Sequence, residues 1–269
     1  MNAEPPHYKN ATKYLQEELQ YLRNRPLRHQ KAAKSHQFTR PVACFTKPDR
    51  LRSGMGSEIT LIFRSRACSW AASSSGGCTM CGYWNDRADG EIQPEHYWQQ
   101  FSSVMEKFKD ILTDNDHSIV FKMFTSGSFC DTNELDLELQ LRILRTLSQY
   151  SNIKEIVIES RPEYLNSTIL TRYREIISTQ YLEIGIGIES SSDYIRTDII
   201  NKGFKWEQVV KAVERVHSYG FGVKAYLLFK PPFLSEYAAI MDLTKSIRDC
   251  VKLGVETISV NPTNIQQNT

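Results

Sequence analysis

The stretch Tyr181-Leu-Glu-Ile-Gly-Ile-Gly-Ile-Glu189 has the most informative strand pattern in the chain. Its even-numbered residues are leucine or isoleucine, and after Tyr181 its odd-numbered residues are glutamate or glycine. Because side chains alternate between the two faces of a strand, one face is aliphatic and the other carries only Glu and Gly. In a barrel the aliphatic face would meet the helices, and the glycines would leave room inside for a ligand to approach the backbone. A barrel filled by its own side chains would carry bulky branched residues there instead.

Strand and helix patterns alternate on both sides of this stretch. Further strands are predicted at 58–66, 119–125, 154–160, 221–229 and 256–261, and helices at 95–112, 134–150, 166–178, 206–219 and 236–253. Such alternation requires parallel strands joined by right-handed crossovers. Neither GxGxxG nor GxxxxGK[ST] occurs, so nucleotide-binding Rossmann and P-loop folds lose support. The pattern predicts an α/β fold, and the strand count leaves an open sheet and a partial or full barrel as alternatives.

The predicted strand at 154–160 ends in charged residues. Glu159 shares a face with Val157 and Arg161. A charged pair at the end of a barrel strand indicates either a polar site or a structural Glu–Arg pair at the barrel mouth.

The first 57 residues differ in character from the rest. A short amphipathic helix is predicted at 11–23, and residues 24–57, rich in Pro, Gly, Ser and basic side chains, predict an irregular lead-in to a core at 58–269. No acidic residue lies between Glu18 and Asp49. That interval holds seven basic residues, namely Arg23, Arg25, Arg28, Lys31, Lys34, Arg40 and Lys47. They predict a solvated basic arm or an arm that neutralises nucleic-acid phosphates.

The composition is that of an ordinary globular protein, with 41% hydrophobic and 24% charged residues. No stretch approaches the roughly 18 apolar residues of a membrane span, and the N-terminus lacks the apolar segment of a secretory signal. We therefore expect a cytoplasmic protein with no membrane association. Structural disulfides are rare in that compartment, so the cysteines need another explanation.

Three of the six cysteines, Cys68, Cys78 and Cys81, fall within fourteen residues. Three thiolates are an incomplete set for structural zinc, which takes four ligands. They are the set that a [4Fe–4S] cluster needs if one iron stays open, since full cysteine ligation would use four. The spacing favours the cluster. The alternative is a zinc-stabilised RNA-binding module without catalysis, with Cys130, His96 or Cys44 as fourth ligand.

The Cys-x9-Cys-x2-Cys loop after the first strand of the core resembles the radical S-adenosylmethionine (SAM) enzymes of the elongator-catalytic-subunit type. The resemblance extends to Ser126-Gly-Ser128, to Glu159-Ser-Arg-Pro-Glu163, and to Gly187-Ile-Glu-Ser-Ser-Ser-Asp193 with the following Ile-Arg196 and Asn201-Lys-Gly-Phe204. It covers about residues 58–262.

This resemblance implies a partial (β/α)6 barrel that holds a [4Fe–4S] cluster and cleaves SAM to a 5′-deoxyadenosyl radical. It assigns the cluster to the three clustered cysteines, and contacts with SAM to Ser126, Gly127, Glu159, Arg161, Glu189 and Arg196. Tyr83 is expected either to stack near the adenine of SAM or to pack the loop.

Within that group, the runs Arg66-Ala-Cys-Ser-Trp70 and Gly76-Gly-Cys-Thr-Met-Cys-Gly-Tyr83, with the ending Ser259-Val-Asn-Pro-Thr-Asn-Ile-Gln266, are most similar to the radical SAM subunits of archaeosine synthases. The resemblance implies modification of a tRNA base by cleavage of a carbon–nitrogen bond in a lysine-modified 7-deazaguanine. It implies tRNA, a partner transferase subunit and an external electron donor as partners. Members of that family continue beyond the position of Thr269, so a C-terminal substrate-binding part is expected to be missing. A radical SAM enzyme with another substrate is the alternative.

Overall fold

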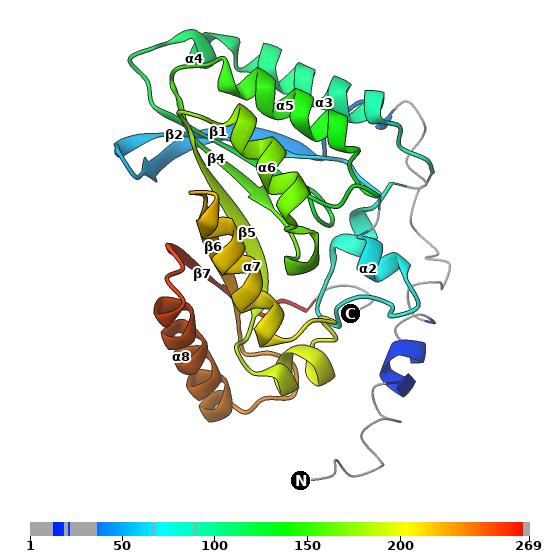
Figure 1. The fold of residues 1–269 in the computed structure, drawn as a ribbon. Helices are drawn as coiled ribbons and strands as arrows, with labels where there is room; N and C mark the ends of the chain where they lie inside the picture. The colour runs from blue at the N-terminus through cyan, green and yellow to red at the C-terminus, as the bar shows by residue number, and fades with distance from the viewer. Residues whose placement is uncertain (1–12, 19–20, 22–36, 67, 89, 266–269) are drawn as a thin grey trace.

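The computed structural model describes residues 13–18, 21, 37–66, 68–88 and 90–265 (Figure 1). Its centre is one seven-stranded sheet whose strands follow one another in chain order. The strands are β1 (Ala43–Leu51), β2 (Gly54–Ile62), β3 (Ile119–Phe124), β4 (Ile153–Glu159), β5 (Tyr181–Glu189), β6 (Gly222–Phe229) and β7 (Thr257–Pro262). Strands β2 to β7 are parallel, and β1 pairs antiparallel with β2. The sheet curls into a half-barrel, which confirms the predicted partial (β/α)6 barrel.

Helices cover the convex face of this sheet (Figure 1). They are α3 (Pro94–Lys107), α4 (Lys109–Thr113), α5 (Leu137–Ser148), α6 (Ser167–Ile176), α7 (Trp206–Ser218) and α8 (Glu236–Lys252). Side chains cap several of them, as where Asp136 accepts a hydrogen bond from the Leu139 amide at the start of α5. Shorter turns stand beside the site: α2 (Ser69–Ala72), η2 (Tyr83–Asp86), η3 (Pro162–Tyr164) and η4 (Ile195–Ile199). None of the helices in the described part of the chain is long and apolar enough to span a bilayer.

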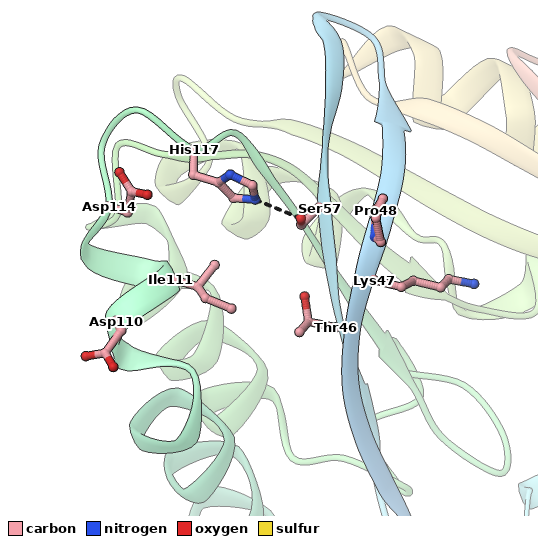
Figure 2. A pocket seen from close by; sticks show the side chains of 8 residues that line it. All are labelled: Thr46, Lys47, Pro48, Ser57, Asp110, Ile111, Asp114 and His117. Atoms are coloured by element: carbon pink, nitrogen blue, oxygen red, sulfur yellow. Dashed lines mark hydrogen bonds between the residues drawn. The ribbon is translucent and has the colours of Figure 1, made fainter.

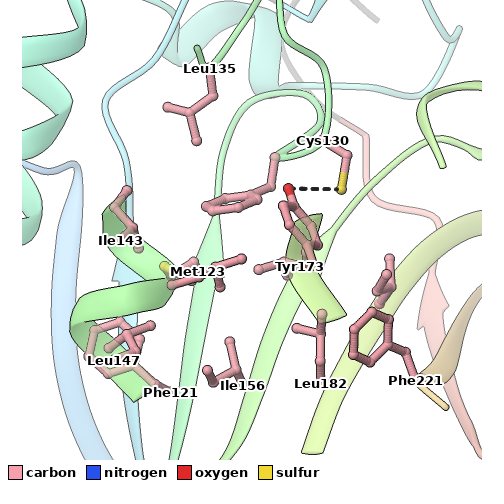
Figure 3. Close-up of a cluster of buried hydrophobic side chains, with 14 of the residues drawn as sticks. Phe121, Met123, Cys130, Leu135, Ile143, Leu147, Ile156, Tyr173, Leu182 and Phe221 are labelled. Atoms are coloured by element: carbon pink, nitrogen blue, oxygen red, sulfur yellow. Dashed lines mark hydrogen bonds between the residues drawn. The ribbon is translucent and has the colours of Figure 1, made fainter. Parts of the chain in front are cut away.

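The main core lies between the sheet and the helices (Figure 3). The aliphatic residues of β5 are fully buried in it, as the alternation predicts. The glycines of β5 point to the concave side, where a Cβ atom at Gly185 would lie 2.7 Å from the Tyr226 ring. The predicted inner face of Glu and Gly is therefore confirmed.

The concave face is polar near the amino-terminal ends of the strands. Lys122 on β3 forms ion pairs of 2.5 Å with both Asp49 on β1 and Glu58 on β2. A small apolar cluster of Leu51, Val120 and Val157 lies on the same side of the sheet. These contacts close the floor of the half-barrel, and the opposite end is formed by the loops that follow the strands.

Two element predictions were wrong. Residues 43–57 are not irregular, because β1 and the start of β2 form a hairpin there. β1 contains Pro48 and is largely exposed at the edge of the sheet, so its sequence lacks the alternation of apolar and polar residues that marks a strand. The single helix expected at 95–112 is interrupted at Phe108, whose φ of −108° and ψ of 20° separate α3 from α4. Of the helix predicted at 11–23, residues 13–18 and 21 are helical, and most of the basic interval 23–47 lies outside the described residues.

Candidate functional site

The three clustered cysteines lie on the loop that follows β2. Cys68 precedes α2, and all three side chains are half-buried and free of disulfides. The Cys81 amide donates to the Cys78 carbonyl at 3.2 Å, which makes the Cys-x2-Cys segment a tight turn. The Ser-Ser-Ser-Gly-Gly stretch has a composition typical of flexible linkers, but it is ordered in the structure. The Ser75 side chain is buried, and its hydroxyl donates to the Trp70 carbonyl at 2.5 Å.

Asn201, which follows β5 and η4 in the chain, holds this loop in place. Its side-chain amide donates to the carbonyls of Ser75 at 2.9 Å and Gly77 at 2.7 Å, and its own carbonyl accepts from the Trp70 indole at 2.8 Å. The Thr79 amide adds a bond to the Ile200 carbonyl at 2.9 Å. Asn201 adopts a φ of 56°, a left-handed conformation that asparagine tolerates better than most residues. The cysteine loop is thus ordered by contacts within the protein itself.

The turn after β3 contains Ser126 and Gly127, and Glu134 packs against it. The Glu134 carboxylate accepts from the Ser128 amide at 2.8 Å and from the Ser69 amide at 2.8 Å. A Cβ atom at position 127 would overlap this carboxylate, so the close approach requires glycine. Burial raises the pKa of Glu134 to about 7. This single side chain joins the cysteine loop to the turn predicted to contact SAM.

Glu159 and Arg161 lie at the end of β4 but do not pair with each other. Arg161 is 8% exposed, and it donates to Glu163 at 2.5 Å and to the Lys202 carbonyl at 2.8 Å. Burial raises the pKa of Glu159 to about 7, although the Tyr226 hydroxyl beside it lowers that value. The alternative of a structural Glu159–Arg161 pair is therefore wrong.

Glu189 and Arg196, at and beyond the end of β5, have different environments. Glu189 accepts from Lys202 Nζ at 2.7 Å and adopts a φ of 65° at a bulge in the strand. Arg196 is fully buried, and its guanidinium donates to Asp193 at 2.6 Å and to the carbonyls of Ile188 and Ser190. Contact of either residue with SAM stays a prediction. The bonds of Arg196 show that it fixes the backbone at the end of β5.

The cations around the cysteines suit a negatively charged group. Burial lowers the pKa of Arg161. Glu163, Cys78 and Cys68 together raise it by more than burial lowers it, so the pKa ends above its ordinary value. Burial likewise lowers the pKa of Lys202, but Glu189 and Cys78 raise it by more, so this pKa also ends above its ordinary value. Both side chains therefore remain charged beside the thiols. Burial and then Glu134 raise the pKa of the Cys68 thiol to about 12. A coordinating metal deprotonates a thiol outright. Three thiols with two adjacent cations fit a thiolate-ligated iron–sulfur cluster.

The fourth ligands considered for zinc are engaged elsewhere. Cys130 is buried in the core beside the Tyr173 hydroxyl (Figure 3), and Cys44 lies on the edge strand β1. His96 Nδ1 accepts from the Gln93 amide at the start of α3. Across the described residues, no group of three His, Cys, Asp or Glu side chains could hold one metal ion. A four-iron cluster does not require that convergence, since each cysteine binds a different iron.

The sequence-based assignment missed Glu134 and Lys202. Lys202 lies in the Asn-Lys-Gly-Phe stretch that carries the resemblance, so its position in a motif was a usable signal. Glu134 had no such signal, because its partners Ser69 and Ser128 lie 65 and 6 residues away with no repeating pattern.

A cleft of about 480 Å³ lies away from these residues (Figure 2). It opens between the β1–β2 hairpin and α4, near the amino-terminal end of β3. His117, Asp110 and Asp114 lie on the α4 side of the cleft, and His117 forms a 2.7 Å hydrogen bond across to Ser57 on the hairpin. None of the predicted site residues lines it.

Curated proteins resemble this chain over most of its length. Archaeosine synthase subunit beta of Methanosarcina acetivorans is 37% identical over 232 residues, which cover 85% of this chain and 64% of that protein. The protein of the same name from Thermococcus kodakarensis is 32% identical over 227 residues, covering 84% and 68%. An uncharacterized protein of Methanocaldococcus jannaschii is 38% identical over 250 residues, covering 92% and 67%. The chain thus spans about two thirds of the length of these relatives.

Solved structures share the fold at low sequence identity. Methylornithine synthase superposes with a TM-score of 0.53 at 15% identity, over 99% of this chain and 63% of that one. SuiB of Streptococcus suis gives a TM-score of 0.51 at 13% identity, over 77% and 40%. The sequence model of the radical SAM superfamily matches residues 65–244, from just after β2 to the middle of α8. By this match and by its half-barrel, the chain belongs to the radical SAM superfamily.

Proposed function

We propose that this chain is the core of a radical SAM enzyme that modifies a tRNA base. The observation that carries the proposal is the cysteine loop, which holds three half-buried thiols and places those of Cys68 and Cys78 beside the charged side chains of Arg161 and Lys202. Superfamily membership supports a [4Fe–4S] cluster and SAM as cofactors. The names of two relatives support archaeosine formation as the reaction.

In this proposal Cys68, Cys78 and Cys81 hold the cluster. When bound, the cluster supplies the electron that cleaves SAM into methionine and a 5′-deoxyadenosyl radical. The chain itself fixes the geometry and excludes water, since the reactive species belong to the cofactors. Glu134 and Asn201 keep the loop in place through their bonds to Ser69, Ser75 and Gly77.

The SAM pocket is proposed at the ends of β3, β4 and β5. The turn at Ser126 and Gly127 would bind the amino group of the methionine part of SAM. Glu159, Arg161 and Glu189 would be further polar contacts. Arg196 would act through the β5 backbone to which it donates.

The substrate assignment rests on the relatives and goes further than the fold does. We propose a lysine-modified 7-deazaguanine of tRNA as substrate, with C–N cleavage as the reaction and a transferase as partner subunit. Because the chain spans about two thirds of its relatives, the rest of the substrate-binding surface is proposed to lie in the part that it does not match. An external electron donor and a cytoplasmic location belong to the same proposal.

The first experiment is anaerobic purification with iron reconstitution, followed by absorbance spectra with and without dithionite. We expect a brown protein that bleaches on reduction, and loss of the chromophore in Cys78→Ala. Cys44→Ala is the matched control, because Cys44 lies on β1 away from the loop and should leave the spectrum unchanged.

The second step tests the reaction. Reduced protein with SAM and tRNA should release 5′-deoxyadenosine, and mass spectrometry of digested nucleosides should show the modified base. A colourless protein that holds one zinc would overturn the radical assignment. Release of 5′-deoxyadenosine without any change in tRNA would point to a different substrate.

A further inference from the structure

Three arginines gather where β2 leads into the cysteine loop. Beyond Ile62 the Phe63 amide still donates to the Phe124 carbonyl of β3, and burial alternates as in a strand, with Phe63 and Ser65 buried, Arg64 half-buried and Arg66 exposed. This alternation turns both arginine side chains away from the core. We call Arg40, Arg64 and Arg66 the arginine rim.

Gln100 of α3 holds the rim together. It is fully buried, and its amide donates to the carbonyls of Phe38 at 2.7 Å and Arg64 at 3.0 Å. Its oxygen accepts from the Arg64 amide at 2.8 Å. The Arg64 guanidinium then donates to the Arg40 carbonyl at 3.3 Å, so Arg40 lies beside Arg64 although 24 residues separate them.

The rim borders the candidate SAM site. Ser65, between the two arginines of the strand, accepts a hydrogen bond from the Ser126 amide at 2.9 Å. Arg66 precedes Cys68 by two residues. The Ala88 amide donates to the Ser65 carbonyl at 3.0 Å, which brings the far end of the cysteine loop back to the rim. Tyr83 on that loop is 63% exposed.

The rim carries positive charge that nearby acids do not neutralise. Arg161 and Arg196 form ion pairs with Glu163 and Asp193. By contrast, among the residues that the structure places, no carboxylate lies at ion-pair distance from Arg40, Arg64 or Arg66. Accessible arginines without acidic partners are suited to phosphate groups, which guanidinium binds in a bidentate manner.

We propose that the arginine rim binds the phosphate backbone of the RNA strand that carries the modified nucleotide. This proposal rests on tRNA being the substrate. Arg64 and Arg66 are two residues apart on an extended chain, about 6.6 Å, a spacing that suits successive phosphates of one strand. The exposed Tyr83, two residues after Cys81 on the same loop, favours RNA over a bare anion or a membrane, because unpaired bases stack on aromatic side chains.

The test is the salt dependence of tRNA binding by the reconstituted protein, with Arg64→Gln/Arg66→Gln as the variant. Loss of two phosphate contacts should reduce the slope of log affinity against log salt by about 1.4 to 1.8. Affinity should fall most at low salt and converge with wild type as the salt concentration rises. The cluster spectrum and SAM affinity should not change. Arg145→Gln/Arg248→Gln is the control, since it removes two exposed arginines from α5 and α8 on the outer layer.

Three results would overturn the rim as an RNA-binding surface. The slope could be unchanged in the rim variant, the control variant could lower it equally, or the rim variant could lose SAM affinity while tRNA binding persists. Loss of binding to anionic lipid vesicles with intact tRNA binding would assign the rim to a membrane surface instead. If wild-type protein forms its cluster and cleaves SAM but binds no tRNA, the proposed substrate itself fails.

Discussion

Asn201 makes four hydrogen bonds through its side chain and carbonyl, and three of them end on the cysteine loop. Replacing it should loosen the loop without touching a cysteine. Asn201→Gly removes the three side-chain bonds, to Ser75, Gly77 and Gln16, but tolerates the left-handed φ, and should cost about 2 to 3 kcal/mol of unfolding free energy. Asn201→Ala should cost about 1 kcal/mol more, because alanine resists that conformation.

Urea unfolding of the iron-free protein measures both values. Release of iron to a chelator from the reconstituted variants should be faster than from wild type. If Asn201→Gly has the stability and the rate of iron release of wild type, Asn201 is not needed to keep the cysteine loop in place.

Glu159 should make the folded state sensitive to pH. Burial raises its pKa to about 7 from an ordinary value of 4.5, so between these values the native state binds more protons than the unfolded chain. Stability therefore falls as the pH rises through this window. Glu159→Gln cannot ionise and should flatten that fall, with Glu134 supplying part of the remaining slope. Urea unfolding at pH 5 and pH 7.5 checks it, and an unchanged pH dependence would contradict the assignment.

At the scale of elements, α3 fixes the start of the cysteine loop. Gln100 satisfies three backbone groups, the carbonyl of Phe38 and both the amide and the carbonyl of Arg64. Gln100→Leu preserves size but leaves these groups without a partner in a buried position, which should cost about 2 to 4 kcal/mol. The exposed neighbour Gln99 gives the matched control, and Gln99→Leu should be close to neutral.

Hydrogen exchange locates the effect. Protection of the amides around 38–40 and 64–66 should fall in Gln100→Leu and stay unchanged in Gln99→Leu. A uniform loss of protection across the sheet would mean that Gln100 supports the whole core and not this junction.

The β1–β2 hairpin shows why an edge element escapes sequence reasoning. β1 is mostly exposed and contains Pro48, so neither period two nor β propensity marks it. Its partner β2 supplies the register, from Ala43 opposite Ile62 to Leu51 opposite Gly54. Proline is tolerated there because β1 is the edge of the sheet.

For the molecule as a whole, removal of iron should leave the fold intact. The protein's own hydrogen bonds join the cysteine loop to residues 199–201 and to Glu134. Chelation should therefore leave the far-ultraviolet circular dichroism unchanged and increase hydrogen exchange only in residues 68–82. Loss of protection throughout β2 to β7 would show that the cluster is needed for folding.

Local patterns in the amino-acid sequence were sufficient to predict the repeating elements and the cysteine set. Strand and helix periods depend on neighbouring residues alone, so β3 to β7 and the helices between them could be predicted to within a few residues. The spacing of Cys68, Cys78 and Cys81 is local too, and three thiolates within fourteen residues already restrict the metal chemistry.

The surroundings of those cysteines depend on tertiary packing and could not be predicted. Glu134, Asn201 and Gln100 act on partners 65, 126 and 62 residues away, and their bonds form where separate strands end at one edge of the sheet. No periodic pattern links such residues, because each pairing depends on the curl of the sheet and the path of a loop. For the same reason the pairing of Arg161 with Glu163, and not with Glu159, follows only from the folded arrangement of the chain.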